Sequence, residues 1–210
     1  MREMGLRSKV GKKYKATTNS NHNLPVAENL LNREFASSAP NEKWVSDITY
    51  VPTDEGWLYL AGILDLHDKV LVGWAMDDNM RKELCIGALT QAILRRGHPT
   101  GVLLHSDRGS QYCSTAYQAM LIKHGFTCSM SRKGNCWDNA PMESFWGKLK
   151  QEWLCDKRFK TRQDAKAAIF VYIETFYNRQ RLHAGLGYEI PAFAAVEAPV
   201  GLRPPSASTA

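Results

Sequence analysis

The sequence predicts an α/β fold in which a mixed five-stranded sheet carries helices on both faces. Two observations support this prediction. Three strand-like segments, at residues 44–52, 57–65 and 70–75, follow one another with only tight turns between them, which indicates an antiparallel meander. From residue 81 to residue 130, helical and strand-like segments alternate, which is typical of parallel strands joined by helices.

The first three strands are indicated by their composition and by the turns that separate them. Residues 44–52 are rich in β-branched and aromatic side chains, which favour a pleated strand. A turn at 54–56 that contains glycine leads into the apolar run 57–65, and the polar residues 67–68 lead into 70–75. Each connection suits a hairpin, so we expect neighbouring strands to pair antiparallel.

The second half of the chain alternates helices with short strands. Apolar residues at helical spacing predict a helix over 81–96, and the apolar run 102–106 predicts a buried strand. A helix at about 114–124 and a strand at 126–130 follow. Because helices connect these strands, we expect them to pair parallel and to be covered by the helices.

Two more helices follow a polar loop at residues 131–139. The first begins at Asn139-Ala140-Pro141, a typical helix start, and the second covers about 162–177. Within the loop, Trp137 either stacks on a nucleic-acid base or anchors the loop. The first helix carries apolar side chains at helical spacing, which we interpret as ordinary core: Met142, Phe145, Trp146, Leu149 and Trp153.

Composition and charge favour a single domain with a polyanionic partner. Of the 210 residues, 44% are hydrophobic, which is enough for a full core, and the net charge is +6. The five cysteines include no Cys-x-x-Cys pair, which argues against a disulfide framework or a zinc site. No apolar run is long enough to span a membrane and no secretory signal is visible, so we expect a cytoplasmic protein.

Charge patterning divides the chain into three parts. Residues 1–42 form a basic N-terminal arm that includes Lys12 and Lys13, and this arm is a solvated linker, a strap along DNA phosphates, or both. Residues 43–198 form the core. Residues 199–210 are rich in proline, serine and alanine and are expected to be a disordered tail.

Three acidic residues occupy positions that suit a metal site. Asp107 follows the buried strand 102–106 and precedes a glycine turn, at the strand end where ligands gather in α/β sheets. Glu143 follows a helix start, and Asp47 lies inside a strand, where aspartate is rare. Carboxylates that converge on hard divalent cations would form a phosphoryl-transfer site.

Spacing alone does not select these acids. Asp107 and Glu143 are 36 positions apart (143 − 107), but so are Asp47 and Glu83 (83 − 47). Glu83 opens a predicted helix, where an acid is ordinarily favoured by the helix dipole. Asp138 has a glutamate at the same distance (174 − 138), but it lies in a polar loop and is interpreted as a helix cap.

Several motifs match one known family. They are Trp-Val-Ser-Asp-Ile-Thr-Tyr at 44–50, His-Ser-Asp-Arg-Gly-Ser-Gln-Tyr at 105–112, the run 129–145, and Tyr-Asn-Arg-Gln-Arg at 177–181 with His183 and Leu-Gly-Tyr at 186–188. Through these motifs the chain resembles the orfB-type DDE transposases of the insertion-sequence-three family. The resemblance implies the ribonuclease H-like fold of the retroviral-integrase catalytic core.

The resemblance also implies a chemistry. It assigns Asp47, Asp107 and Glu143 as the catalytic triad and as the ligands of two Mg²⁺ or Mn²⁺ ions. Family members cut double-stranded DNA at element ends and join those ends to target DNA by in-line phosphoryl transfer. We therefore expect DNA as the partner, a homo-oligomer assembled on that DNA, and association with the bacterial nucleoid.

One feature departs from the family pattern. Members usually carry a helical DNA-binding region ahead of this core, and this chain begins near the end of that region. We expect either a truncated copy or reliance on a helix-turn-helix partner protein from an upstream reading frame.

Cations in several segments are predicted to contact DNA phosphates. Lys150 shares a helix face with Glu143 and Gly147, so it either holds a phosphate beside the metals or is a solvated lysine. The other predicted DNA-contacting residues are Lys12, Lys13, Arg132, Lys133, Arg179 and Arg181.

Two alternative functions remain open. A ribonuclease H-like nuclease or resolvase would use the same metals for hydrolysis alone, and the long match around Glu143 argues against it. A truncated, catalytically silent DNA-binding relic would fit the missing N-terminal region, but the intact acidic triad argues against decay of the site.

Overall fold

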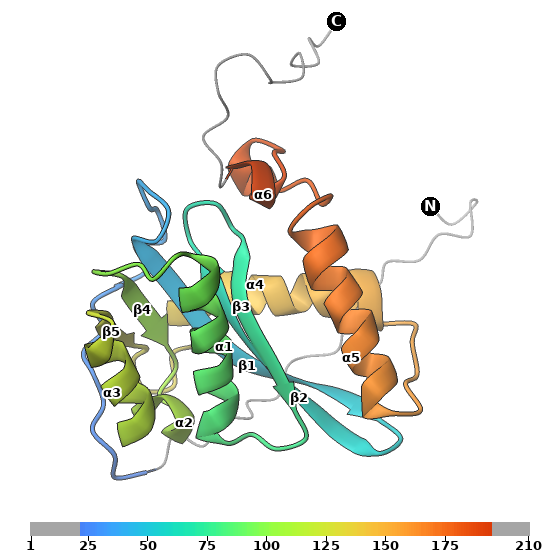
Figure 1. Cartoon of the computed structure of the whole chain (residues 1–210), viewed down its shortest axis with the longest axis horizontal. Helices are drawn as coiled ribbons and strands as arrows, with labels where there is room; N and C mark the ends of the chain where they lie inside the picture. Colours follow the sequence, from blue (N-terminus) through green and yellow to red (C-terminus); the bar gives the residue numbers. More distant parts are fainter. Residues whose placement is uncertain (1–21, 195–210) are drawn as a thin grey trace, which may run out of the picture.

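The structure is a computed structural model that describes residues 22–194. Its five strands form one sheet in the order β3-β2-β1-β4-β5, with helices on both faces, which confirms the predicted mixed sheet (Figure 1). Residues 1–21 of the predicted arm and the predicted tail lie outside the described residues. The strands are β1 (Lys43–Thr53), β2 (Gly56–Asp65), β3 (Leu71–Asp77), β4 (Leu103–Ser106) and β5 (Thr127–Met130).

The sheet combines the two pairing modes that the connections predict. β1, β2 and β3 are joined by short turns and pair antiparallel, whereas β1, β4 and β5 pair parallel. β1 is therefore the central strand and has a neighbour on each side. A residue in the middle of β1 is shielded from solvent by both neighbours.

Helices cover the two faces of the sheet and build a separate core on each. On one face lie α1 (Lys82–Arg95), α2 (Ser110–Cys113) and α3 (Thr115–Lys123); the four-residue α2 was not predicted. On the other face lie α4 (Ala140–Lys148) and α5 (Arg162–Phe170). Figure 1 shows α4 crossing the sheet on the side away from α1.

Both helices on the second face continue into π-helical turns. α4 runs into η2 (Leu149–Leu154), and α5 runs into η3 (Val171–Tyr177). Two short elements, η4 (Ala184–Leu186) and α6 (Pro191–Ala194), complete the described C-terminal part, and none of the helices within residues 22–194 is long and apolar enough to cross a bilayer.

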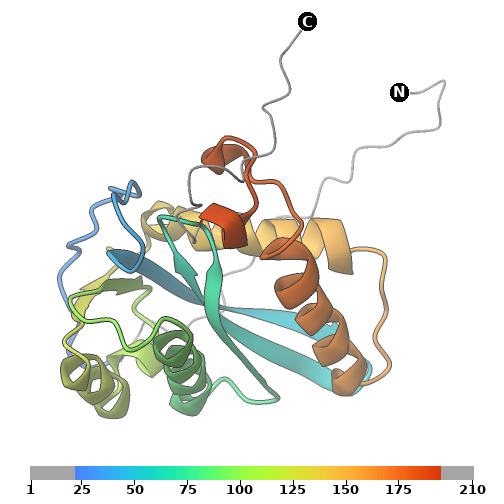
Figure 2. The ribbon, with the colours of Figure 1, turned by 45° about the horizontal axis from the view of Figure 1, so that its top comes forward.

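The described part of the predicted arm packs on the core. Leu31 is 1% exposed, and the backbone N–H groups of Leu30 and Leu31 donate to Ser129 Oγ at 2.9 and 3.1 Å. The Met130 N–H donates to the carbonyl of Glu28. Figure 2 shows this blue segment running along the β5 edge of the sheet. Residues 22–42 therefore contact the domain that follows them.

Candidate active site

The register of two parallel strands brings the first two acids side by side. β1 and β4 pair as far as Val45 and His105. Asp47 and Asp107 each lie two residues beyond that pair. Because side chains alternate between the faces of a strand, equivalent positions on neighbouring parallel strands point the same way. The middle of β1 and the residue that follows β4 therefore present the two carboxylates on the same side.

The two aspartates differ in their surroundings. Asp47 is 8% exposed, and the indole N–H of Trp146 donates to its Oδ2 at 3.0 Å. Asp107 is half-buried just after β4, and its Oδ1 accepts a hydrogen bond from the Gly109 N–H at 2.8 Å. That bond closes the turn which the glycine after β4 predicted.

A hydrogen bond between the start of α4 and β1 positions the third acid, Glu143. Asn139, which precedes α4, donates from Nδ2 to the carbonyl of Ser46 at 3.0 Å. Ser46 is the neighbour of Asp47, so the start of α4 is fixed beside the central strand. Glu143 lies in the first turn of α4 and is half-buried, and that burial raises the pKa of its carboxyl.

Asp47 lies close enough to Asp107 and Glu143 for both charges to affect its carboxyl. Burial raises the pKa of Asp47 to about 8, and the charges of Asp107 and Glu143 add to the rise. Backbone and indole donors lower it only in part. Two acids from other elements therefore lie within electrostatic reach of Asp47 and disfavour its ionised form.

This donor set fits divalent cations. Mg²⁺ and Mn²⁺ prefer hard oxygen ligands, and a doubly charged ion would neutralise the repulsion among three carboxylates. Within residues 22–194, no three histidine, cysteine, aspartate or glutamate side chains are already gathered into a metal-holding group. Asp107 and Glu143, both half-buried, would have to move closer to Asp47 for the three acids to share an ion.

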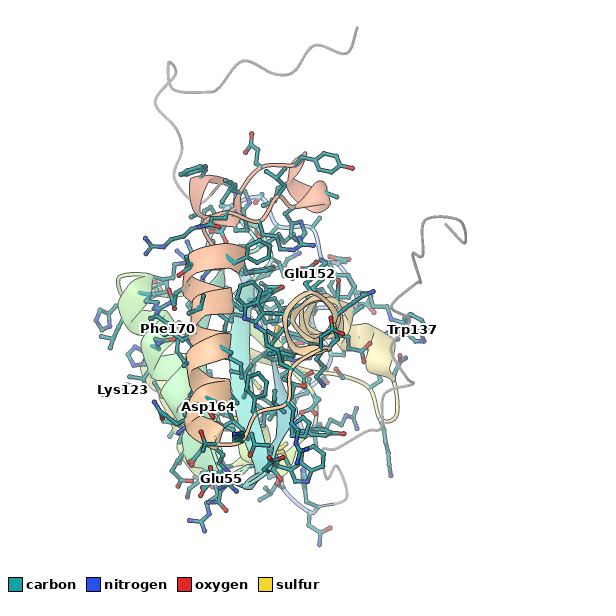
Figure 3. The ribbon with its side chains drawn as sticks, turned by 90° about the vertical axis from the view of Figure 1, so that its right-hand side faces the viewer. Glu55, Lys123, Trp137, Glu152, Asp164 and Phe170 are labelled. Carbon is teal, nitrogen blue, oxygen red and sulfur yellow. The ribbon has the colours of Figure 1, made fainter. Side chains whose placement is uncertain are left out.

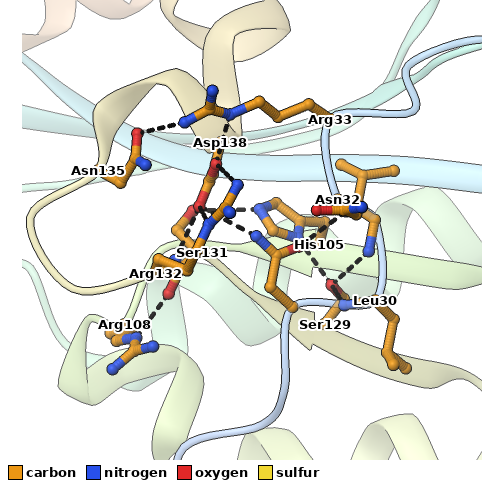
Figure 4. A network of polar contacts seen from close by, with 12 residues as sticks. Leu30, Asn32, Arg33, His105, Arg108, Ser129, Ser131, Arg132, Asn135 and Asp138 are labelled. Atoms are coloured by element: carbon orange, nitrogen blue, oxygen red, sulfur yellow. Dashed lines mark hydrogen bonds and ion pairs between the residues drawn. The ribbon is translucent and has the colours of Figure 1, made fainter.

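A buried carboxylate, Asp138, holds the loop that precedes Glu143 (Figure 4). Its side chain is fully buried and accepts hydrogen bonds from Arg33 Nε (2.8 Å), Asn29 Nδ2 (3.0 Å) and the Arg132 guanidinium (2.8 and 3.0 Å). The interpretation of Asp138 as a helix cap was wrong. Asn139 precedes α4 instead, without a side-chain capping bond, and Asp138 joins the loop to residues 22–42.

The same loop presents Trp137 to solvent. Trp137 is 67% exposed and projects away from the ribbon in Figure 3. It therefore does not anchor the loop, because Asp138 beside it does so. Gly134, at the tip of the loop, has a φ of +71° and open space around it.

The cations predicted to contact DNA fall into three groups. Lys12 and Lys13 lie outside the described residues. Lys133 and Arg179 are exposed. The remaining three already have intramolecular contacts: Arg132 with Asp138, Arg181 with Glu152 through three hydrogen bonds of 2.6 to 3.1 Å, and Lys150 with the face of Tyr50 at 5.2 Å.

Lys150 lies close enough to Asp47 for the two charges to interact. The negative charge of Asp47 raises the pKa of its ammonium group, although burial lowers it more. The face that it shares with Glu143 also contains Gly147, and nothing lies within 4 Å of where a Cβ on Gly147 would be. The surface of α4 at Gly147 therefore leaves room for a close approach.

Sequence reasoning missed two residues that shape the site. Trp146 was interpreted as plain core, and Asn139 only as part of a helix start. The sequence carried one signal for Trp146: a buried indole N–H needs an acceptor, and the apolar side chains on the same helix face cannot provide one. No local pattern pointed to the bond from Asn139.

Comparison with known sequences identifies the family. Residues 37–136 and 124–191 match the integrase core domain family. The chain is 56% identical over 191 residues to an uncharacterised 31 kDa protein of insertion element IS600 from Shigella sonnei, covering 91% of this chain and 70% of that one. It is 47% identical over 187 residues to transposase InsF of IS3A from Escherichia coli K12, with 89% of this chain and 65% of InsF covered.

Comparison with solved structures supports the fold. The catalytic core domain of HTLV-2 integrase, solved with magnesium, superimposes with a TM-score of 0.59 at 16% identity, covering 77% of this chain and all of that one. A chain in a simian T-cell lymphotropic virus intasome gives 0.64 at 16% identity, covering 92% of this chain and 66% of that one. The chain therefore belongs to the integrase core domain family and is homologous to proteins of the insertion sequences IS600 and IS3.

Proposed function

We propose that this chain catalyses metal-dependent cleavage and strand transfer of DNA, with Asp47, Asp107 and Glu143 as its catalytic residues. The observation that supports the proposal is that β1, the end of β4 and the first turn of α4 bring two further carboxylates within electrostatic reach of Asp47. Such a donor set needs no protein nucleophile, because a water molecule or a DNA 3′-hydroxyl attacks the phosphate in line.

The three acids would hold two Mg²⁺ or Mn²⁺ ions between them. When bound, such ions activate the attacking hydroxyl and stabilise the leaving oxygen. Asp47 would be the ligand common to both ions, because it is the most buried of the three acids and the charges of both others act on it. Asp107 and Glu143 would each complete one ion site from a half-buried position.

The open face of α4 supports a path for DNA beside the acids. Gly147 leaves room for a backbone to approach, and the ammonium group of Lys150 would pair with a phosphate next to the scissile one. Trp137 would stack on a base, since it is exposed and makes no anchoring contact for the loop. Lys133 and Arg179, both exposed, would contact phosphates farther along.

Strand transfer distinguishes this function from hydrolysis alone. Pre-cut element-end DNA and a supercoiled target plasmid should yield joined products in Mg²⁺. A nuclease or resolvase would only nick the target. Products without covalent joining would favour that alternative, and absence of both reactions would favour a catalytically silent relic.

The active assembly would form on DNA. We propose a homo-oligomer bound to element ends in the cytoplasm, at the nucleoid, with a helix-turn-helix partner protein as one source of end recognition. The chain spans 65% of the length of InsF. We therefore propose, as a second source, that element ends are recognised by a region equivalent to the part of InsF that this chain does not match.

The basic arm should contribute to DNA affinity through phosphates alone. Replacing Lys9, Lys12, Lys13 and Lys15 with alanine is expected to weaken binding to all sequences equally, because phosphate contacts carry no sequence information. For every lysine that pairs with a phosphate, its replacement should reduce the slope of log K against log salt by about 0.9. Fluorescence anisotropy between low and moderate salt measures both. A Lys123→Ala variant, changed on the exposed end of α3, is the control, and an unchanged slope would make the arm a linker.

The described core is expected to bind DNA with little sequence preference. Its predicted contacts are to phosphates and to the face of one base. Neither kind of contact discriminates strongly between base sequences. A competition assay between element-end DNA and scrambled duplex at fixed salt tests this. Preference for the true end by about 10³-fold or more, as in specific recognition, would contradict the prediction and assign a reader to the core.

A further inference from the structure

A tryptophan on α4 holds the central acid in one orientation. Trp146 is 3% exposed, and its Nε1–H donates to Asp47 Oδ2 at 3.0 Å between two buried groups. A hydrogen bond to one oxygen of a carboxylate restrains rotation about the Cβ–Cγ bond, so the second oxygen keeps a fixed direction. When Asp47 is ionised, as it is with a metal bound, the bond is stronger than one between neutral groups.

The neighbouring strand is shaped to admit this indole. Gly62 on β2 lies opposite Asp47 in the antiparallel register. A Cβ on Gly62 would lie 2.8 Å from Cη2 and 3.2 Å from Cζ2 of Trp146, closer than side chains can approach without a shift. The bare backbone at this position is what lets the ring lie over β2 and reach Asp47.

Packing alone does not explain the arrangement. Phe145 meets the ring of Trp146 edge-on at 4.9 Å, so another apolar side chain would fill much of the same space. Only an indole adds a donor at this depth, and its N–H would be an unsatisfied polar group if Asp47 did not accept it. The hydrogen bond therefore satisfies both the indole N–H of Trp146 and one oxygen of Asp47.

We propose that Trp146, lying against Gly62, is a positioning residue that fixes the Asp47 carboxylate for binding of divalent cations. The inference rests on the proposed function, since it assigns to Asp47 the role of shared ligand. Groups that orient metal ligands typically change metal affinity or activity by about 10–100-fold when removed.

The decisive variant removes the donor and keeps a ring. Trp146→Phe is expected to lower kcat for strand transfer by about 10–100-fold while leaving KM for DNA unchanged, because Trp146 is buried and does not face DNA. Trp153→Phe is the matched control. Trp153 also donates its indole N–H, to the carbonyl of Ala168 at 2.9 Å, but it lies against α5 away from the acids. Equal losses in the two variants would overturn the proposal.

A second variant tests the contact between Gly62 and the indole ring of Trp146. Gly62→Ala should displace Trp146 and reproduce the loss of kcat. If both act through the same contact, the double variant Gly62→Ala with Trp146→Phe should be no slower than Gly62→Ala alone. If the two losses of kcat multiply in the double variant, the two substitutions act independently and the shared mechanism is overturned.

Two further measurements do not depend on catalysis. In metal-free protein, the ¹H–¹⁵N indole signal that disappears in Trp146→Phe should move when Asp47 is replaced by asparagine, and a stationary signal would overturn the contact. Calorimetric titration should show Mn²⁺ binding weakened in Trp146→Phe and unchanged in Trp153→Phe; equal binding would overturn the positioning role. An inactive wild-type chain that still gives these two results would contradict the proposed function while retaining the positioning role.

Discussion

Asp107→Asn is expected to abolish Mg²⁺-dependent strand transfer while leaving the fold intact. An amide has no charge with which to hold a hard cation, and metal assistance supplies several kcal/mol of transition-state stabilisation. Since about 1.4 kcal/mol corresponds to a factor of ten, the rate should fall by about 10³-fold or more. Asp47→Asn and Glu143→Gln should behave alike, because all three carboxylates serve one site.

Thermal unfolding and a matched acid separate chemistry from folding. Removing one of three mutually repelling carboxylates should not lower the unfolding temperature. Glu83→Gln is the control, because Glu83 has the same sequence separation from Asp47 that Glu143 has from Asp107 but lies exposed in the first turn of α1. It should retain full activity. An active Asp107→Asn protein would remove Asp107 from the triad.

Asp138→Asn should be the most destabilising polar substitution in the loop before α4. It removes the charge that Arg33 and Arg132 share while keeping the shape of the side chain. Breaking a buried ion pair costs about 3–5 kcal/mol, but both arginines are nearly half exposed and can return to water. We therefore expect the free energy of unfolding to fall by about 2–3 kcal/mol.

The loss should depend on pH in a defined direction. The guanidinium of Arg132 and the other donors hold the pKa of Asp138 well below its usual value. The contribution of ionised Asp138 to the free energy of unfolding is therefore complete above the ordinary aspartate pKa of about 3.9. It is lost as the pH falls below that value. Urea unfolding of wild type and Asp138→Asn should differ at pH 7 and converge in acid. A constant difference would mean that shape, not charge, is responsible.

The sheet and the acids were predictable because their signals are local. Alternation and composition identify strands, short turns identify the meander, and a polar Asp47 inside an apolar strand is conspicuous in its own neighbourhood. The connections predict which strands pair parallel, and the register observed between β1 and β4 then places Asp107 level with Asp47.

The contacts that tune the site were not predictable, because they join distant parts of the chain. Trp146 lies 99 positions from Asp47, and Arg33 lies 105 positions from Asp138. Helical periodicity says that Trp146 is buried but not what its N–H meets, and charge patterning says only that Arg33 belongs to a basic segment. The π-helical turns after α4 and α5 also escape a spacing rule based on 3.6 residues per turn.

The attachment of residues 22–42 sets the smallest piece of this protein that can be studied alone. A fragment cut at residue 43 would retain all five strands, yet it would leave Asp138 without Arg33 and Asn29, and Ser129 without the N–H groups of Leu30 and Leu31. Limited proteolysis of the intact chain should therefore spare the stretch after residue 28. We therefore expect that a fragment able to fold alone must begin upstream of β1, at or before Glu28, whose carbonyl accepts from Met130.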